Sequence, residues 1–481
     1  MGFMKTEYAA LKLPKMHECI GHVLGETKRH LTTFTVAMLT VSTPLAADDS
    51  TGSTATSSQL AENTPKAFAY FPQPRIRIQQ PGRLTKFTGD IHGFSINQTT
   101  GFLSSVPGSP TASGWDARDL VFSPNGKFGY IVADNYIYGY SVNADTGRLT
   151  AMMVSPFYVG GRSGNDVHIT PSGQHLLTSN FLSSSISVFS ISDTGGLTAA
   201  TGSPFDTGIL QAYQRGLIID PSGQYVYVFG MVETADKTSV WKLFGYSLDS
   251  KTGTLKAITG MPIAMMGRRM TFGATGNYAY VENNSKTPSY VLSLNAETGL
   301  LSKLPASNGE FDMGTRGFTL TPLGNFAYAL DQNNSDTLMI FSVDPFTGKI
   351  KKIFTKPTEA SKVGYNPNYI TLNEAGTLMY VPDTQGNNVY GFSVNQATGA
   401  LTKVAGSPFS AGDYPMRFTI SPSGKYGYVT NAGHATRSNP TVASTVSGYS
   451  INAKTGVLTS LTGSPFAING GKYGITMYPN N

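Results

Sequence analysis

Two side chains near residue 167 have the chemistry of a general base and its partner. Asp166 and His168 are two positions apart in a segment where aliphatic and polar residues alternate. In an extended strand, residues i and i+2 point to the same face. A carboxylate at that spacing can orient an imidazole so that it takes a proton from water. The alternative is structural, with the histidine hydrogen-bonded in a polar wall.

Six arginines could hold an anion. They lie at or beside one equivalent position of a repeated segment: Arg118, Arg215, Arg268, Arg269, Arg316 and Arg417. A guanidinium binds carboxylate or phosphate through two parallel hydrogen bonds, and a ring of them focuses positive potential. The alternative is that these arginines pair with Asp119, Asp166 and loop acids, or are simply solvated at a rim.

These residues must be positioned by an internal repeat, because eight of the Thr-Gly pairs in the chain follow one another at spacings of 46 to 58 residues. An aliphatic residue follows each glycine by two positions, and seven of the eight glycines have Asn or Asp four residues before them. Asn or Asp begins a type I turn, and glycine accepts the left-handed conformation that ends it. The pattern predicts a hairpin with a bulge at each pair. The glycines are Gly101, Gly147, Gly195, Gly253, Gly299, Gly348, Gly399 and Gly456.

A second turn precedes each of these hairpins. In five repeats it has the form Pro-x-Gly, as in Ser123–Gly126 and Ser421–Gly424, with an apolar run before it and a strand such as Tyr225–Val228 after it. Each repeat therefore supplies four short antiparallel strands, A to D. Four strands repeated about every fifty residues indicate a β-propeller. A pair of β-sandwiches would not explain one motif order kept through eight copies.

The two ends of the repeated region complement each other. Met477–Pro479 matches the end of a strand A, whereas Phe68–Phe71 matches a strand B with no strand A before it. Residues 66–481 allow 52 residues for each of eight blades. We predict an all-β propeller of eight four-stranded blades, closed by C-terminal strand A joining N-terminal strands B–D. Seven blades is the alternative.

Aligning the repeats on the Pro turn places the candidate residues at the mouth of the central tunnel. The strand A position that includes His168 is otherwise Thr or aliphatic: Val121, Ile218, Thr271, Thr319, Thr371, Thr419 and Thr476. The alternation predicts that this row faces the tunnel. The arginines and Asp166 precede the row by two or three positions, where each strand A begins.

The N-terminal region reads as an export signal. Lys28 and Arg29 precede the uncharged segment 31–46, which ends in small residues, as in a signal peptide. We expect a leader at 1–47, a flexible low-complexity linker at 48–65 and the propeller at 66–481. The mature chain would be periplasmic or secreted, with no membrane span after processing; the alternative is that the leader stays as an anchor. The only cysteine, Cys19, lies in the leader.

Composition excludes several classes of partner. The formal net charge is +6, and no Lys/Arg run interleaves with aromatics, so we expect no nucleic acid. The sequence has no Walker A loop, clear Rossmann glycine pattern, His-Glu-x-x-His or Gly-x-Ser-x-Gly motif. We therefore expect neither cofactor nor metal, and we expect a monomer.

The repeats resemble a known family. Tyr428–Asn431 reads Tyr-Val-Thr-Asn, the YVTN repeat signature, and Ser421–Val429 followed by a Thr-Gly-x-Leu turn resembles the lactonase-type propellers. That family includes 6-phosphogluconolactonase and a cycloisomerase that forms muconolactone. The resemblance implies a propeller over residues 66–481 and a histidine at or next to the start of a strand A. Three such places here lack it, with Asn165-Asp166, Asn368-Tyr369 and Met416-Arg417.

The sequence thus supports two functions of different kinds. One is an exported lactonase-like propeller that binds a small anionic or sugar-derived ligand at the tunnel mouth and hydrolyses a lactone, with His168 as base and the arginines holding the oxyanion or a carboxylate. The other is a non-catalytic YVTN-type propeller. It would hold a protein or glycan with the long loops at 72–89, 232–240 and 432–445.

Overall fold

A computed structural model describes most of the propeller region of the chain. The residues it describes are 66–78, 86–115, 117, 119–162, 164–209, 215–283, 289–305, 310–311, 315–331, 337–353, 362–364, 366–367, 369–433, 444–468 and 474–479. The predicted leader and linker lie outside them. Every regular element within these ranges is a strand, and none of the described residues form a helix that could span a membrane.

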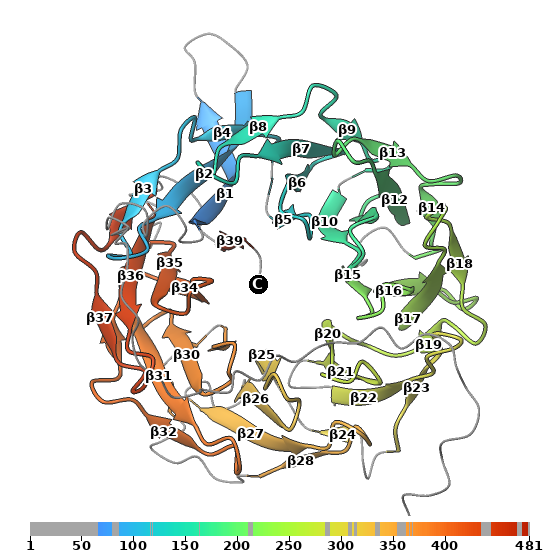
Figure 1. Cartoon of the computed structure of the whole chain (residues 1–481). Coiled ribbons are helices and arrows are strands. Elements are labelled where there is room, and N and C mark those ends of the chain that lie inside the picture. The colour runs from blue at the N-terminus through green and yellow to red at the C-terminus, as the bar shows by residue number, and fades with distance from the viewer. Residues whose placement is uncertain are drawn as a thin grey trace, which may run out of the picture. The chain divides into compact units, whose positions relative to one another are not determined.

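Eight antiparallel sheets are arranged as blades around a central axis (Figure 1). In each sheet the strand order from the axis outward is A-B-C-D, which confirms the prediction of eight blades. Blades are numbered here along the chain, with blade 1 containing the first strand. The inner A strands are β39 (Thr476–Tyr478), β5 (Leu120–Phe122), β10 (Gly164–Ile169), β15 (Arg215–Ile219), β20 (Arg269–Phe272), β25 (Thr315–Leu320), β29 (Thr371–Leu372) and β34 (Pro415–Ile420).

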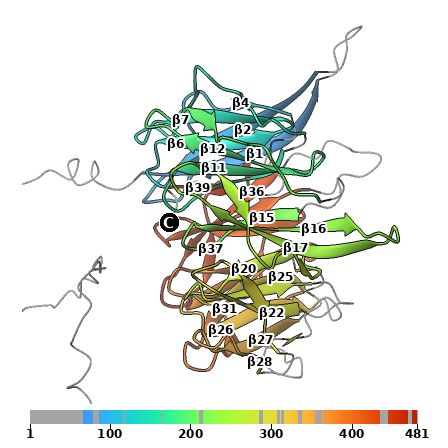
Figure 2. The ribbon, with the colours of Figure 1, turned by 90° about the vertical axis from the view of Figure 1, so that its right-hand side faces the viewer.

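The B and C strands form the middle of each blade. The B strands are β1 (Ala67–Ile78), β6 (Phe128–Ala133), β11 (His175–Asn180), β16 (Tyr225–Glu233), β21 (Tyr278–Glu282), β26 (Phe326–Asp331), β30 (Leu378–Asp383) and β35 (Tyr426–Asn431). The C strands are β2 (Lys86–Ile96), β7 (Tyr136–Val142), β12 (Ser185–Ile191), β17 (Ser239–Leu248), β22 (Ser289–Leu294), β27 (Leu338–Val343), β31 (Asn388–Val394) and β36 (Thr445–Ile451). Strands β16 and β17 continue through most of the loop expected at 232–240, as a ribbon visible from the side (Figure 2).

The outer edge of most blades has one more strand than the sequence predicted. The D strands are β3 (Leu103–Ser105), β8 (Leu149–Ala151), β13 (Leu197–Ala199), β18 (Leu255–Ala257), β23 (Leu301–Lys303), β28 (Ile350–Lys352), β32 (Leu401–Lys403) and β37 (Leu458–Ser460). Within the described residues, seven blades have a fifth short strand that also pairs with strand C. These strands are β4 (Thr111–Ser113), β9 (Phe157–Tyr158), β14 (Phe205–Asp206), β19 (Ile263–Ala264), β24 (Glu310–Phe311), β33 (Phe409–Ser410) and β38 (Phe466–Ala467).

The ring closes as predicted, with the last strand of the chain in the first blade. Strand β39 pairs antiparallel with β1, and Ala69 lies opposite Met477. The apolar core between blades 1 and 8 contains Phe71 from β1 and Tyr428 from β35. Equivalent cores lie between other neighbouring blades. Burial of large apolar side chains between sheets is the main favourable term in such a ring.

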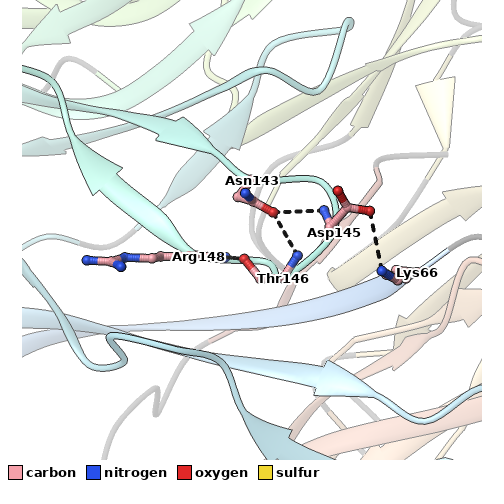
Figure 3. Close-up of polar contacts among 5 residues, drawn as sticks. All are labelled: Lys66, Asn143, Asp145, Thr146 and Arg148. Carbon is pink, nitrogen blue, oxygen red and sulfur yellow. Dashed lines mark hydrogen bonds and ion pairs between the residues drawn. The ribbon is translucent and has the colours of Figure 1, made fainter.

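The turn chemistry of the repeat holds each C–D hairpin (Figure 3). In blade 2, the Asn143 side-chain oxygen accepts the backbone N–H groups of Asp145 and Thr146 at 3.0 and 2.9 Å. Gly147 then takes a φ of 71°, which glycine adopts without steric cost. On the exposed side, Lys66 Nζ lies 3.3 Å from Asp145 Oδ1. The Asn-to-Gly spacing thus encodes the hairpin.

A tyrosine in strand B joins most blades to the next. The Tyr428 hydroxyl of blade 8 donates to the Gly101 carbonyl in the hairpin of blade 1, at 2.7 Å. Five other tyrosines make the same contact with the following blade: Tyr70 with Gly147, Tyr130 with Gly195, Tyr227 with Gly299, Tyr328 with Gly399, and Tyr380 with Gly456. The strand that follows the second turn and the Thr-Gly hairpin, both predicted from the sequence, therefore supply the two halves of one contact between blades.

Replacing Tyr428 with phenylalanine is expected to lower the free energy of unfolding by about 1–3 kcal/mol, because the buried Gly101 carbonyl loses its donor while the ring remains. Urea unfolding followed by tryptophan fluorescence measures this change. Tyr136→Phe is the matched control, since Tyr136 is 39% exposed and its substitution should have little effect. Equal stability of the Tyr428→Phe and Tyr136→Phe variants would contradict a role for the hydroxyl in closing the ring.

Candidate active site

A cavity of about 710 Å³ opens where the A strands meet. Its wall comes from the A strands of blades 1 to 5 and the residues just before them, together with Arg417 of blade 8. Of the predicted site residues, Asp166, His168, Arg268, Arg269 and Arg417 all line it. The repeat alignment therefore brought together residues that are up to about 250 positions apart in the chain.

The A strands are irregular at the points where the predicted site residues lie. The pairing of strands A and B shifts register between Gly164 and Val167 in blade 3, and between Pro415 and Phe418 in blade 8. Blades 4 and 6 have a shift at the corresponding place. A bulge of this kind re-aims the side chains beside it. Side chains after the bulge alternate regularly between the two faces of strand A, and His168 is one of them. Asp166 and Arg417 lie within the bulge, outside that alternation.

Asp166 and His168 are paired across this bulge. His168 Nε2 lies 3.5 Å from Asp166 Oδ2, and the side chains are 41% and 16% exposed, respectively. The Asp166 carboxylate also accepts the Leu217 backbone N–H of blade 4 at 2.7 Å, and it accepts the hydroxyl of Ser179. The carboxylate is thus fixed by two neighbouring blades, whereas the imidazole is open to the cavity.

The environment of Asp166 keeps it ionised. Burial acts to raise the pKa of the carboxyl group, but the hydrogen bond and charge of His168, together with the donors of Ser179 and Leu217, outweigh burial and lower the pKa. A group with a lowered pKa in the folded state stabilises the fold above its unfolded value near 4, and that contribution is lost as the pH falls. The Asp166 carboxylate therefore stays negatively charged beside His168 at neutral pH.

Two of the predicted arginines meet on one aromatic ring. Arg269 Cζ lies 5.4 Å and Arg417 Cζ 5.7 Å from the centre of the Tyr369 ring. Arg269 Nη2 also donates to the Tyr369 hydroxyl at 3.4 Å. Burial acts to lower the pKa of Arg269, but this bond and nearby negative potential raise it, so the guanidinium stays charged. Tyr369 occupies the repeat position of Asp166, yet the sequence alone assigned it no role.

The other predicted arginines are not placed by the structure. Arg118 lies outside the described residues. Arg215 and Arg316 belong to β15 and β25, but their side chains are not described. Whether a complete ring of guanidiniums surrounds the mouth thus remains a prediction.

The structure corrects the reading of one histidine. We would expect His175, at the start of a strand B, to be a surface residue, but it is 2% exposed. It lies against the Gly253 hairpin of blade 4, and Leu177 occupies the position of the tyrosine that contacts the next blade elsewhere. Burial lowers the pKa of His175. His434 lies outside the described residues. Within the described part of the chain, no cluster of three His, Cys, Asp or Glu side chains could hold a metal ion.

The chain matches a family model described as lactonase, 7-bladed β-propeller, over residues 88–242 and 314–412. The stretch between these segments, 243–313, contains every strand of blade 5, from β20 to β24. The chain described here has eight blades. Arg268 and Arg269 precede or belong to β20, and Arg417 lies beyond residue 412, so these three arginines are outside the matched segments.

Relatives with curated names agree with this match. A 6-phosphogluconolactonase of Formosa agariphila is 26% identical over 340 residues, covering 65% of this chain and 91% of that protein. A 6-phosphogluconolactonase of Klebsiella pneumoniae is 34% identical over 155 residues, which covers 31% of this chain and 44% of that protein. A solved structure of a candidate 6-phosphogluconolactonase of Bacteroides uniformis superimposes with a TM-score of 0.50 at 20% identity, covering 74% of this chain and 99% of that one. At that identity the superposition speaks for the fold alone.

Proposed function

The chain belongs to the lactonase family of β-propellers, and from this premise we propose that it hydrolyses the lactone of a small, sugar-derived acid at the tunnel mouth. One observation carries the proposal: the Asp166–His168 pair and the guanidiniums of Arg269 and Arg417 line the same cavity. A base and a cationic group are the two parts that ester hydrolysis needs.

In the proposed reaction, His168 is the general base. Its Nε2 faces Asp166, so that Nδ1 has the lone pair available to a water molecule. The water oxygen attacks the lactone carbonyl carbon while its proton passes to Nδ1. The tetrahedral intermediate then collapses, the bond from carbon to the ring oxygen breaks, and the imidazolium returns its proton to that oxygen. The product is an open-chain hydroxy acid, which ionises at neutral pH.

The arginines have a separate task in this reaction. A guanidinium beside the carbonyl oxygen stabilises the negative charge that develops there in the transition state. The same groups also attract the carboxylate of the product or an anionic group of the substrate. The relatives are named for a phosphorylated lactone, and we propose sugar-derived lactones more broadly as the class to test.

A panel of lactones followed by proton release at constant pH tests the proposal directly. We expect turnover of at least one sugar-derived lactone well above its spontaneous hydrolysis. A protein that is folded by circular dichroism but turns over none of the panel would contradict the proposal. That outcome would favour the non-catalytic interaction module, in which the loops of the mouth hold a protein or a glycan.

We further propose that the mature chain acts in the periplasm or outside the cell, as a monomer. The uncharged segment at 31–46 after Lys28 and Arg29 supports export, and the absence of cysteine after Cys19 is compatible with an oxidising compartment. Mass spectrometry of the exported protein should give an N-terminus near Ala47. An unprocessed chain retained in the cytoplasm would contradict this assignment.

A further inference from the structure

Tyr369 lies between two cations that come from different blades. Arg269 belongs to β20 of blade 5 and Arg417 to β34 of blade 8, whereas Tyr369 precedes β29 of blade 7. Both guanidiniums are within 5.7 Å of its ring centre. Two like charges repel each other, and an aromatic face attracts both of them. The ring therefore offsets the repulsion and brings together two groups that would otherwise separate.

The segment that carries Tyr369 is fixed to its own blade by a buried carboxylate. Asp383, at the end of β30, is 1% exposed and accepts the backbone N–H of Asn366 at 3.1 Å. The Thr384 backbone N–H donates to the Asn366 carbonyl, also at 3.1 Å. Pro367 forms an isolated bridge with Asp383. These contacts set the path of the chain just before Tyr369.

The same corner of blade 7 also holds the strand that carries Arg417. The Thr384 hydroxyl donates to the Pro415 carbonyl at 3.0 Å, and Asn387 Oδ1 accepts the Tyr414 backbone N–H at 2.9 Å. Thr384 is fully buried. Adjacent residues, Asp383 and Thr384, therefore position the chain before Tyr369 and the chain before Arg417. Contacts between blades 7 and 8 therefore set the distance between the Tyr369 ring and the Arg417 guanidinium.

The two guanidiniums have hydrogen-bonding capacity left for a ligand. Each guanidinium has five N–H donors, and the Tyr369 hydroxyl accepts one of them from Arg269 at 3.4 Å. Both arginines line the cavity that contains His168. An oxyanion with two or more acceptor oxygens that lies between the two guanidiniums can accept a hydrogen bond from each of them. This arrangement includes blade 5, which lies outside the segments that match the family model.

We propose that Tyr369 is a positioning residue that holds Arg269 and Arg417 as a clamp for one oxyanion of the substrate, so that the enzyme selects lactones bearing an anionic group over neutral ones. The kinetic part of this inference rests on the proposed lactone hydrolysis, whereas the binding part does not. The oxyanion that the clamp binds is a carboxylate or a phosphate, and the binding experiment below distinguishes these two groups.

The binding experiment uses the full chain and two probes, citrate and inorganic phosphate, measured by titration calorimetry. We expect the wild-type protein to bind at least one probe, Tyr369→Phe to weaken binding about threefold by losing the hydroxyl, and Tyr369→Leu to weaken it tenfold or more by losing the ring. The stronger probe identifies the preferred oxyanion. Tyr390→Leu is the matched control, because Lys403 Nζ lies 5.4 Å from the Tyr390 ring centre on the same blade, and neither residue lines the cavity.

The kinetic experiment compares the lactone of a dicarboxylic sugar acid with its neutral counterpart. Tyr369→Leu should raise KM for the anionic lactone about tenfold and leave KM for the neutral lactone unchanged, and any loss of kcat from the displaced guanidiniums should be the same for both lactones. Thermal unfolding checks that each variant is folded, and Tyr369→Phe serves if the leucine variant is not.

Either of two results would overturn the inference: wild-type protein that binds neither probe, or Tyr369 variants that bind like Tyr390→Leu. Binding that depends on Tyr369 in a protein without lactone turnover would support the clamp and reject the proposed hydrolysis. Lactone turnover whose constants do not depend on Tyr369 would support the proposed hydrolysis and reject the clamp.

Discussion

Substitution of His168 by alanine is expected to lower kcat for lactone hydrolysis by about 10²–10⁴-fold, because the attacking water loses its base. KM should change little, since in the proposed mechanism the anion is held by Arg269 and Arg417 rather than by the imidazole. Asp166→Asn should also lower kcat: the amide keeps an acceptor for the Leu217 N–H but cannot stabilise an imidazolium by charge. Proton release on the best lactone of the panel gives both constants.

Ile218→Val is the matched control for this experiment. Ile218 occupies the position of His168 in the next blade and lines the same cavity, but it has no proton to exchange. The small loss of volume should cost about 0.5–1.5 kcal/mol of stability and leave kcat close to wild type. Full turnover by His168→Ala would remove the histidine from the mechanism. An equal loss in Ile218→Val would show that packing of the wall, rather than proton transfer, limits the rate.

Raising the pH above about 10 is expected to unfold the propeller steeply. Nine tyrosines are almost completely buried: Tyr70, Tyr130, Tyr140, Tyr227, Tyr280, Tyr328, Tyr380, Tyr428 and Tyr449. Burial raises the pKa of each of them above its usual value of 10. A raised pKa in the folded state means that these groups favour the fold fully below pH 10 and disfavour it as the pH rises further.

The slope follows from the number of protons involved. Above pH 10 the unfolded chain loses these protons while the folded chain keeps them, and each costs about 1.4 kcal/mol per pH unit. Nine together lower the free energy of unfolding by on the order of 10 kcal/mol per pH unit. Phenolate absorbance at 295 nm should therefore rise in one cooperative step with the loss of β-sheet circular dichroism. Tyr428→Phe should make the pH dependence shallower by about one proton. Titration of these tyrosines at pH 11 with the sheet signal intact would contradict the account.

The repeat in the sequence predicted the architecture because its signals are local. Asn143 and Gly147 define a hairpin through contacts within five residues, and such chemistry is readable without tertiary information. Ring closure was also predictable, because the C-terminal end of the chain has a strand A with no strand B after it. The N-terminal end of the repeated region has a strand B with no strand A before it. The pairing of Tyr70 with Thr476 confirms it.

Parts of the site depended on contacts that a sequence pattern does not encode. The Tyr369 ring meets Arg269 and Arg417 only because blades 5, 7 and 8 curve around one tunnel. The alignment put Tyr369 in the correct row but could not tell a wall residue from one that contacts two cations. His175 was misjudged because its neighbour, the Gly253 hairpin, belongs to the next blade.

The fifth strand was missed for a different reason. In the seven blades where it is described it has only two or three residues, too few to show a periodic pattern. Its place is held by a serine after the D strand, as where Ser155 Oγ accepts the Gly139 backbone N–H at 3.0 Å. The recurring Ser-Pro pairs at 109–110, 155–156, 203–204, 407–408 and 464–465 were the signal that could have revealed it.

A crystal of the wild-type protein soaked with the hydroxy acid product of its best lactone tests the central claim most directly. The account predicts the product in the cavity at the tunnel mouth, with its anionic group against the guanidiniums of Arg269 and Arg417 and a hydroxyl within reach of His168. Product bound only elsewhere on the propeller, or a cavity that stays empty at saturating concentration, would contradict it.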